Sequence, residues 1–178
     1  AAVRLCGAIF LLLIWLATVE RTHAQIQVGQ TITGAAADDR FGTYISLSDD
    51  GRIMAVGAPQ AGEPGLQFAG ITKVYENQSG NWVQIGSDIL VEERSSFSGS
   101  VSLSADGTIL ALGAPRYGIQ GILAEGLVRV LQYQSGDWVQ LGQDILGPVG
   151  SDFFGAALSL SSDGSTLVIG NTGAGQVQ

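Results

Sequence analysis

One sequence unit occurs three times in the chain, and this repeat constrains the fold more than any other feature. Each copy begins at a phenylalanine (Phe41, Phe97 or Phe154), continues through apolar and small residues, and then places an Asp-Gly pair before an apolar run. The copies are spaced by 56 and 57 residues. A regular period of this length predicts a stack of similar supersecondary units rather than one irregular core.

Every complete unit is predicted to contain four short strands. The first alternates apolar residues with small polar ones, at the period of a strand. The second is a continuous apolar run, which favours a strand buried on both faces. A turn-rich Gln-Ser-Gly sequence joins the third strand to the fourth. The strands are expected near residues 45–47, 53–56, 70–75 and 82–85 in the first unit, near 101–103, 109–112, 126–131 and 138–141 in the second, and near 167–169 in the third.

We therefore predict an all-β fold made of β-propeller blades, each a sheet of four antiparallel strands. The blades span residues 41–89 and 97–145, and an incomplete blade spans 154–178. Residues 25–32 resemble the fourth strand of a blade, so they are expected to close a ring by completing its last blade. Because a ring takes about 4–8 blades, the chain is expected to be an N-terminal fragment. An open solenoid of the same units is the alternative.

The N-terminus has the pattern of a secretory signal peptide. Arg4 precedes an apolar run over residues 5–19, and a polar stretch follows that ends at Ala24. Because the run is shorter than the ~20 residues that cross a bilayer, residues 1–24 are predicted to be removed, which leaves no membrane span. An uncleaved anchor is the alternative. The protein is expected to be secreted, in the extracellular space or at the cell surface, without Cys6 and His23.

The acidic balance of the chain narrows the classes of partner. There are 16 Asp and Glu residues against 8 Lys and Arg, which gives a formal net charge of −8. Binding to nucleic acid requires clustered Lys and Arg, so nucleic acid is not an expected partner. An anionic membrane surface is disfavoured for the same reason.

The repeated residues resemble the FG-GAP repeat family, whose blades form the head of integrin alpha chains and occur in many secreted proteins. The first copy has both parts of the motif, Phe41-Gly42 and Gly57-Ala58-Pro59. The second keeps Gly113-Ala114-Pro115, and the third keeps Phe154-Gly155 but loses Ala-Pro. The resemblance covers nearly all of residues 25–178. It implies a β-propeller, expected to be seven-bladed, that serves adhesion or protein binding rather than catalysis.

The Asp-Gly corners are weak candidates for calcium binding. Many repeats of the family have a calcium loop of pattern Asp-x-Asp-x-Asp-Gly, whereas the corners here are shorter. Calcium takes six to eight oxygen ligands, and one or two carboxylates cannot supply them. Asp-Gly is also among the strongest hairpin signals, so no metal or cofactor is predicted. The calcium alternative involves Asp49, Asp50, Asp106 and Asp163.

No catalytic residues are predicted. Without Cys6 and His23, the mature segment lacks Ser-His and Cys-His nucleophilic sites and the usual zinc ligand sets. The expected function is therefore noncatalytic binding or adhesion. A secreted carbohydrate hydrolase that uses two carboxylates is the first alternative, and a structural repeat of an envelope or matrix protein is the second.

Two long, non-repeating loops between the second and third strands are the candidate binding surface. Loops on a rigid scaffold commonly carry binding residues, so a protein or glycan ligand is expected at this end of the blades. The alternative is that the loops only cover the blade rim. The candidate residues are Leu66, Phe68, Arg116, Tyr117, Ile119 and Ile122.

Some other residues are assigned to the framework or to modification. Trp82 and Trp138 recur in phase, so they are expected to pack within their blades rather than grip a ligand, and the repeated phenylalanines likewise. Asn77 begins an Asn-Gln-Ser sequence on a predicted hairpin, which is a candidate for N-glycosylation.

Overall fold

A computed structural model describes residues 26–62, 70–90, 99–117, 125–148, 153–172 and 175–178. In these ranges the regular structure is β-strand, apart from a short 3-10 helix, η1 (Ala37–Asp39). The all-β prediction is therefore confirmed. In the same ranges no helix has the length and apolarity needed to cross a membrane. The predicted signal peptide, together with Phe97 and the loop candidates Leu66, Phe68, Ile119 and Ile122, lies outside the described residues.

The first sheet is an antiparallel meander of four strands with a short fifth strand. Its order is β1-β2-β3-β4, and β5 pairs with the beginning of β3. This arrangement matches the predicted four-stranded blade. The strands are β1 (Tyr44–Leu47), β2 (Ile53–Ala58), β3 (Ile71–Gln78), β4 (Asn81–Gln84) and β5 (Ile89–Leu90).

The second sheet repeats this topology, and the third contains its first part. The second sheet has the order β6-β7-β8, with β9 and β10 both paired to β8, and the third has the order β11-β12-β13. The second sheet comprises β6 (Val101–Leu103), β7 (Ile109–Ala114), β8 (Leu127–Gln134), β9 (Asp137–Gln140) and β10 (Ile145–Leu146). The third comprises β11 (Phe154–Leu160), β12 (Leu167–Asn171) and β13 (Gln176–Val177).

The outer edge of each complete sheet is more broken than predicted. β4 pairs with the second half of β3, and Ile85 N then donates a hydrogen bond to Val74 O at 2.9 Å. The chain bulges outward at Gly86, whose φ is +72°, and returns to β3 as β5. One fourth strand was expected near 82–85, but the edge is two short strands separated by this bulge. The second sheet has the same break between β9 and β10.

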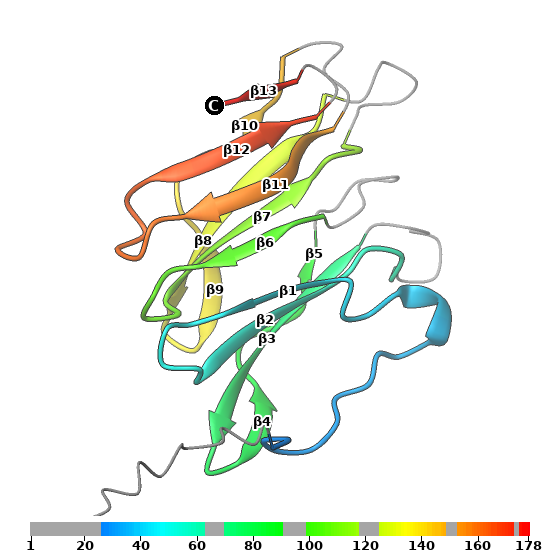
Figure 1. The fold of residues 1–178 in the computed structure, drawn as a ribbon, viewed down its shortest axis with the longest axis vertical. Coiled ribbons are helices and arrows are strands. Elements are labelled where there is room, and N and C mark those ends of the chain that lie inside the picture. Colours follow the sequence, from blue (N-terminus) through cyan, green and yellow to red (C-terminus); the bar gives the residue numbers. More distant parts are fainter. Residues whose placement is uncertain (1–25, 63–69, 91–98, 118–124, 149–152, 173–174) are drawn as a thin grey trace, which may run out of the picture.

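The three sheets follow one another along the long axis of the molecule (Figure 1). The main apolar core lies between the first two sheets. Ala55 and Val74 of the first sheet are fully buried in the same cluster as Leu103, Leu110 and Leu112 of the second. The middle strand β7 is buried along nearly its whole length, as its unbroken apolar run predicts. A second cluster joins the second and third sheets through Val128, Phe154 and Ile169.

Residues 26–32, which are predicted to complete the last blade of a ring, are not paired as a strand with the three sheets described. Their contacts run through side chains instead of a strand ladder. The Gln30 side chain donates to Trp82 O at 2.8 Å and accepts from Trp82 N at 3.0 Å, and Trp82 Nε1 donates to Val28 O at 3.1 Å. The segment therefore lies beside β4, and its ring-closing role stays a prediction.

Candidate functional site

The two ends of the stacked sheets differ in character. The Asp-Gly turns that join β1 to β2, β6 to β7 and β11 to β12 lie on the left in Figure 1, at one end of the sheets. The connections from β2 to β3 and from β7 to β8 leave the opposite end. Both ends contain residues that the sequence singles out.

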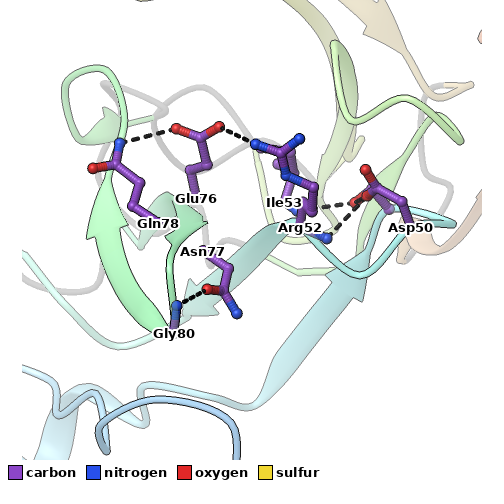
Figure 2. A network of polar contacts seen from close by, with 8 residues as sticks. Asp50, Arg52, Ile53, Glu76, Asn77, Gln78 and Gly80 are labelled. Carbon is purple, nitrogen blue, oxygen red and sulfur yellow. Dashed lines mark hydrogen bonds and ion pairs between the residues drawn. The ribbon is translucent and has the colours of Figure 1, made fainter.

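The Asp50 corner is held by a closed set of turn hydrogen bonds. Asp50 Oδ1 accepts from Ser48 Oγ at 2.7 Å and from Arg52 N at 2.9 Å. Ser48 Oγ in turn accepts from Ile53 N at 2.9 Å, at the first residue of β2. Figure 2 shows the Asp50 carboxylate pointing back at the main chain of Arg52 and Ile53. The carboxylate thus fixes the turn that starts the buried strand.

The other two corners repeat this geometry. Asp106 Oδ1 accepts from Ser104 Oγ at 2.7 Å and from Thr108 N at 3.0 Å. Asp163 Oδ1 accepts from Ser161 Oγ at 2.6 Å and from Ser165 N at 3.0 Å.

These bonds favour the charged carboxylates, so the pKa of each corner aspartate lies below its usual value. The pKa of Asp163 falls to about 2, chiefly because Ser161 donates to it. The pKa of Asp106 is lowered first by Ser104, and that of Asp50 first by the Arg52 amide.

The four calcium candidates thus lie in turns, and no two corners share a site. Asp49 is exposed, and its amide donates to Ala105 O of the next sheet at 2.9 Å. Over the described ranges, no group of three or more His, Cys, Asp or Glu residues is placed to hold a metal. The geometry of these residues is that of a structural hairpin corner.

The sequon asparagine lies beside the β3–β4 turn. Asn77 Oδ1 accepts from Gly80 N at 2.8 Å, as Figure 2 shows, while Ser79 is exposed at the turn. Beside it, Arg52 forms an ion pair with Glu76 at 3.5 Å, and Glu76 also accepts from Gln78 at 3.0 Å. The turn places the half-buried Asn77 next to exposed polar side chains.

At the opposite end, main-chain hydrogen bonds join the two ends of each long loop where it leaves its sheet. Ala61 O accepts from Gly70 N at 2.8 Å, and Tyr117 O accepts from Glu125 N and Gly126 N, both at 3.0 Å. Each loop therefore begins and ends at one fixed point on the rigid sheet. Tyr117 is half-buried against the main core, so its ring belongs partly to the scaffold rather than wholly to the loop surface.

Arg116 and Phe153 form an exposed pair between the second and third sheets at this end. The Arg116 guanidinium carbon lies 5.5 Å from the centre of the Phe153 ring, within the range of a cation–π contact. Arg116 is exposed, and Phe153 is 38% exposed. The sequence identified Arg116 but missed Phe153, although the Phe153-Phe154 doublet was a signal, because the buried Phe154 supplies the repeated framework position.

A groove of about 320 Å³ lies between the outer edges of the first two sheets. The sequence did not indicate this groove. Arg129 lines it and forms a two-pronged ion pair with Asp144 at 2.7 and 2.8 Å. Arg129 also donates to Leu90 O at 3.4 Å. This pair, which lowers the pKa of Asp144, ties the bulge of the second sheet to the first.

The repeated tryptophans join neighbouring edges, beyond the packing within blades that was predicted. The Trp138 ring lies 5.2 Å from that of Tyr133 in its own sheet. Its indole nitrogen, however, donates to Ile85 O of the first sheet at 3.3 Å. Trp82 makes the corresponding bond to Val28. Both tryptophans are therefore framework residues that act between successive edges.

No protein-family model and no curated protein matches the sequence. Among solved structures, the fold is similar to that of a periplasmic gluconolactonase of Pseudomonas aeruginosa, with a TM-score of 0.54 and 22% sequence identity. The match covers 76% of this chain and 38% of that one, so the chain spans well under half of the enzyme's length. The likeness, together with the antiparallel sheets, shows a partial all-β propeller.

Proposed function

We propose that this protein is a secreted, noncatalytic propeller module that binds a protein or glycan ligand at the end of its blades where the long loops emerge. The exposed Arg116–Phe153 pair carries the proposal. A guanidinium and an aromatic ring that lie together between two blades offer charge, hydrogen-bond donors and an apolar face in one place.

The hydrogen bonds at the two ends of each loop support binding at this end of the blades. Hydrogen bonds at Ala61 and Tyr117 fix the roots of both loops to the sheets, so little backbone freedom is lost there when a ligand binds. The family resemblance of the repeat points to adhesion as the purpose of such binding. Secretion is proposed from the apolar run over residues 5–19, and N-terminal sequencing of the exported protein tests it.

The binding proposal is tested with a glycan array and a cell-adhesion assay on immobilised protein. Arg116→Ala and Phe153→Ala are expected to weaken binding by about tenfold or more, as expected for residues central to an interface. Arg52→Ala is the matched control, because Arg52 is an exposed arginine at the opposite end. A wild type that binds neither glycans nor cells, or an equal loss with Arg52→Ala, contradicts the proposal.

A secreted hydrolase is the second candidate function, and the gluconolactonase likeness is the observation that favours it. Hydrolysis of gluconolactone releases an acid, so a pH-stat measurement on the purified protein tests this candidate directly. Turnover well above the spontaneous rate would replace the noncatalytic proposal with an enzymatic one.

A further inference from the structure

The groove between the outer edges of the first two sheets has the size of a small-ligand site. Its volume of about 320 Å³ lies at the lower end of the range of about 300–1,000 Å³ that ligand pockets occupy. One wall is the part of the first sheet from Ser87 to Leu90, and the other is formed by β8 and β9 of the second sheet. Both walls of this outer-edge groove thus belong to sheets that have all their strands.

The floor of the outer-edge groove is apolar and held in place. Ile89, Leu131 and Trp138 line the groove and are only 8%, 5% and 8% exposed, so they lie at its base. Trp138 is fixed by its bond to Ile85 O at 3.3 Å and by the Tyr133 ring, whose centre is 5.2 Å away. A ligand in the groove therefore meets a preformed apolar surface.

Polar groups line the mouth of the groove, and the Asp137 carboxylate among them is fixed by the first sheet. Asp137 Oδ1 accepts from Ser87 N at 2.8 Å and from Trp138 N at 2.9 Å, and Oδ2 accepts from Ser87 Oγ at 3.2 Å. These bonds lower the pKa of Asp137, first through the Ser87 amide. Because a carboxylate has about four acceptor sites, Asp137 can accept a further hydrogen bond from a ligand.

Gln140 and Asp88 add further hydrogen-bonding groups. Gln140 lies two residues after Trp138 on β9, so its side chain points to the same face of the sheet. Its nitrogen donates to Asp144 Oδ1 at 2.9 Å, and the second N–H of the amide can serve a ligand. Asp88 is held by Lys73 at 3.0 Å. Since these side chains already have fixed positions, little side-chain freedom is lost on binding.

The charges around the groove favour a neutral ligand over an anionic one. Lys73 and Arg129 neutralise Asp88 and Asp144 through ion pairs at 3.0 and 2.7 Å. No such ion pair forms on Asp137 within the described ranges, so the groove has an excess of negative charge. In the same ranges, His, Cys, Asp and Glu form no cluster that could hold a metal ion. A ligand that donates hydroxyl groups suits these carboxylates.

We propose that the outer-edge groove is a second binding site, which takes a small neutral saccharide. A sugar combines what both parts of the groove require, because its C–H groups can lie on the apolar floor while its hydroxyl groups donate to Asp137 and accept from Gln140. The site lies between the first two sheets, whereas the Arg116–Phe153 pair lies between the second and third. The proposal therefore does not rest on ligand binding at the long loops.

Titration of the purified protein by nuclear magnetic resonance tests the site. The probes are glucose, N-acetylglucosamine, cellobiose and mannobiose, each added separately. The reporter is the indole N–H signal of Trp138, because this ring lines the groove. At least one probe is expected to shift this signal in a saturable manner, while the indole signal of Trp82, which contacts Val28 instead, stays in place. A Trp138 signal that responds to none of the four sugars overturns the proposal.

Asp137→Asn separates recognition of the sugar from folding. The first sheet has Asn81 at the position that corresponds to Asp137, so asparagine fits this turn, and its side-chain oxygen can still accept from Ser87 N. Loss of the second carboxylate oxygen and of the charge is expected to raise the dissociation constant about tenfold. Glu76→Gln is the matched control, since it removes one charge on β3 outside the groove. Equal losses in both variants contradict a specific role for Asp137.

Arg116→Ala distinguishes this site from the loop end. The variant is expected to leave the sugar-induced shift of Trp138 unchanged, even where it weakens adhesion. Loss of sugar binding in Arg116→Ala but not in Asp137→Asn would move the sugar to the loop end, which overturns the outer-edge site and leaves the proposed function standing. Sugar binding that depends on Asp137 in a protein without adhesion would support the outer-edge site alone.

Discussion

The indole nitrogen of Trp138 donates a hydrogen bond to the main-chain carbonyl of Ile85 across the boundary between the first two sheets, at 3.3 Å. The ring lies over Gly86, the bulge residue of the first sheet, where an added Cβ would be 2.7 Å from Trp138 Cδ1. The bulge and the tryptophan are thus two halves of one contact, which explains why both recur with the period of the repeat.

Gly86→Ala is therefore expected to destabilise the protein through this contact. The new methyl group forces the indole away from Ile85, and overpacking of this kind costs about 1–3 kcal/mol. Gly142→Ala is the matched control, since Gly142 has a similar φ of +78° but no atom within 4 Å of an added Cβ. Urea unfolding measures both variants. Equal losses would show that backbone strain alone sets the cost.

The Asp163 corner is expected to make stability depend on pH in the acid range. The folded-state pKa of Asp163, about 2, lies below its ordinary value of 3.8. A depressed pKa means that the stabilisation is present above about pH 4 and is lost as the pH falls toward 2. Ser161→Ala removes the main cause and should raise the pKa of Asp163 toward 3.8. NMR titration measures this shift, and Ser162→Ala should leave the pKa unchanged.

The sequence predicted the fold well where the signal was local. The unbroken apolar run of β7 predicted its position and its burial, and the Asp-Gly pairs marked the turns. The sequence missed β5, because the pairing of so short a strand depends on which partner is near. Two residues of β5 pair only where β3 runs long enough to meet them. The ring-closing strand predicted for residues 25–32 stays a prediction.

The candidate site was predicted less completely than the fold. Arg116 stood out because its loop does not repeat, but Phe153 was hidden beside a repeated phenylalanine. The role of Trp138 between sheets was missed, since its partner is a main-chain carbonyl that leaves no signal in the residue types. The Arg129–Asp144 pair was missed for a related reason. Arg129 and Asp144 are distant in sequence, and only the folded sheet shows that the chain returns to β8 and places Asp144 beside Arg129.

The Arg129–Asp144 ion pair is expected to contribute more to the free energy of unfolding than the Arg52–Glu76 ion pair. Asp144→Asn removes a two-pronged bond between side chains that are 20% and 27% exposed, and hydrogen bonds to charged groups contribute about 1.5–3 kcal/mol. Glu76→Gln breaks a 3.5 Å contact to a side chain that is 65% exposed, which should cost less than about 1 kcal/mol. Chemical denaturation compares them, and similar losses would contradict this ranking.

Asn77 is expected to accept an N-linked glycan when the protein passes through a eukaryotic secretory pathway. The side-chain oxygen is committed to Gly80 N at 2.8 Å, whereas a glycan attaches to the nitrogen, so the turn can keep its bond after modification. The neighbouring Ser79 is exposed at the turn. Glycosidase treatment should therefore increase the gel mobility of the secreted wild type.

The control for this prediction separates the sequon from the turn. Ser79→Ala destroys the Asn-Gln-Ser pattern but leaves Asn77 to hold Gly80, so it should abolish the glycosidase-sensitive shift without lowering the melting temperature. Asn77→Gln removes both features, and a turn that loses its bond to Gly80 should be less stable by about 1 kcal/mol. A wild-type protein whose mobility does not respond to the glycosidase would show that the half-buried Asn77 is closed to the transferase.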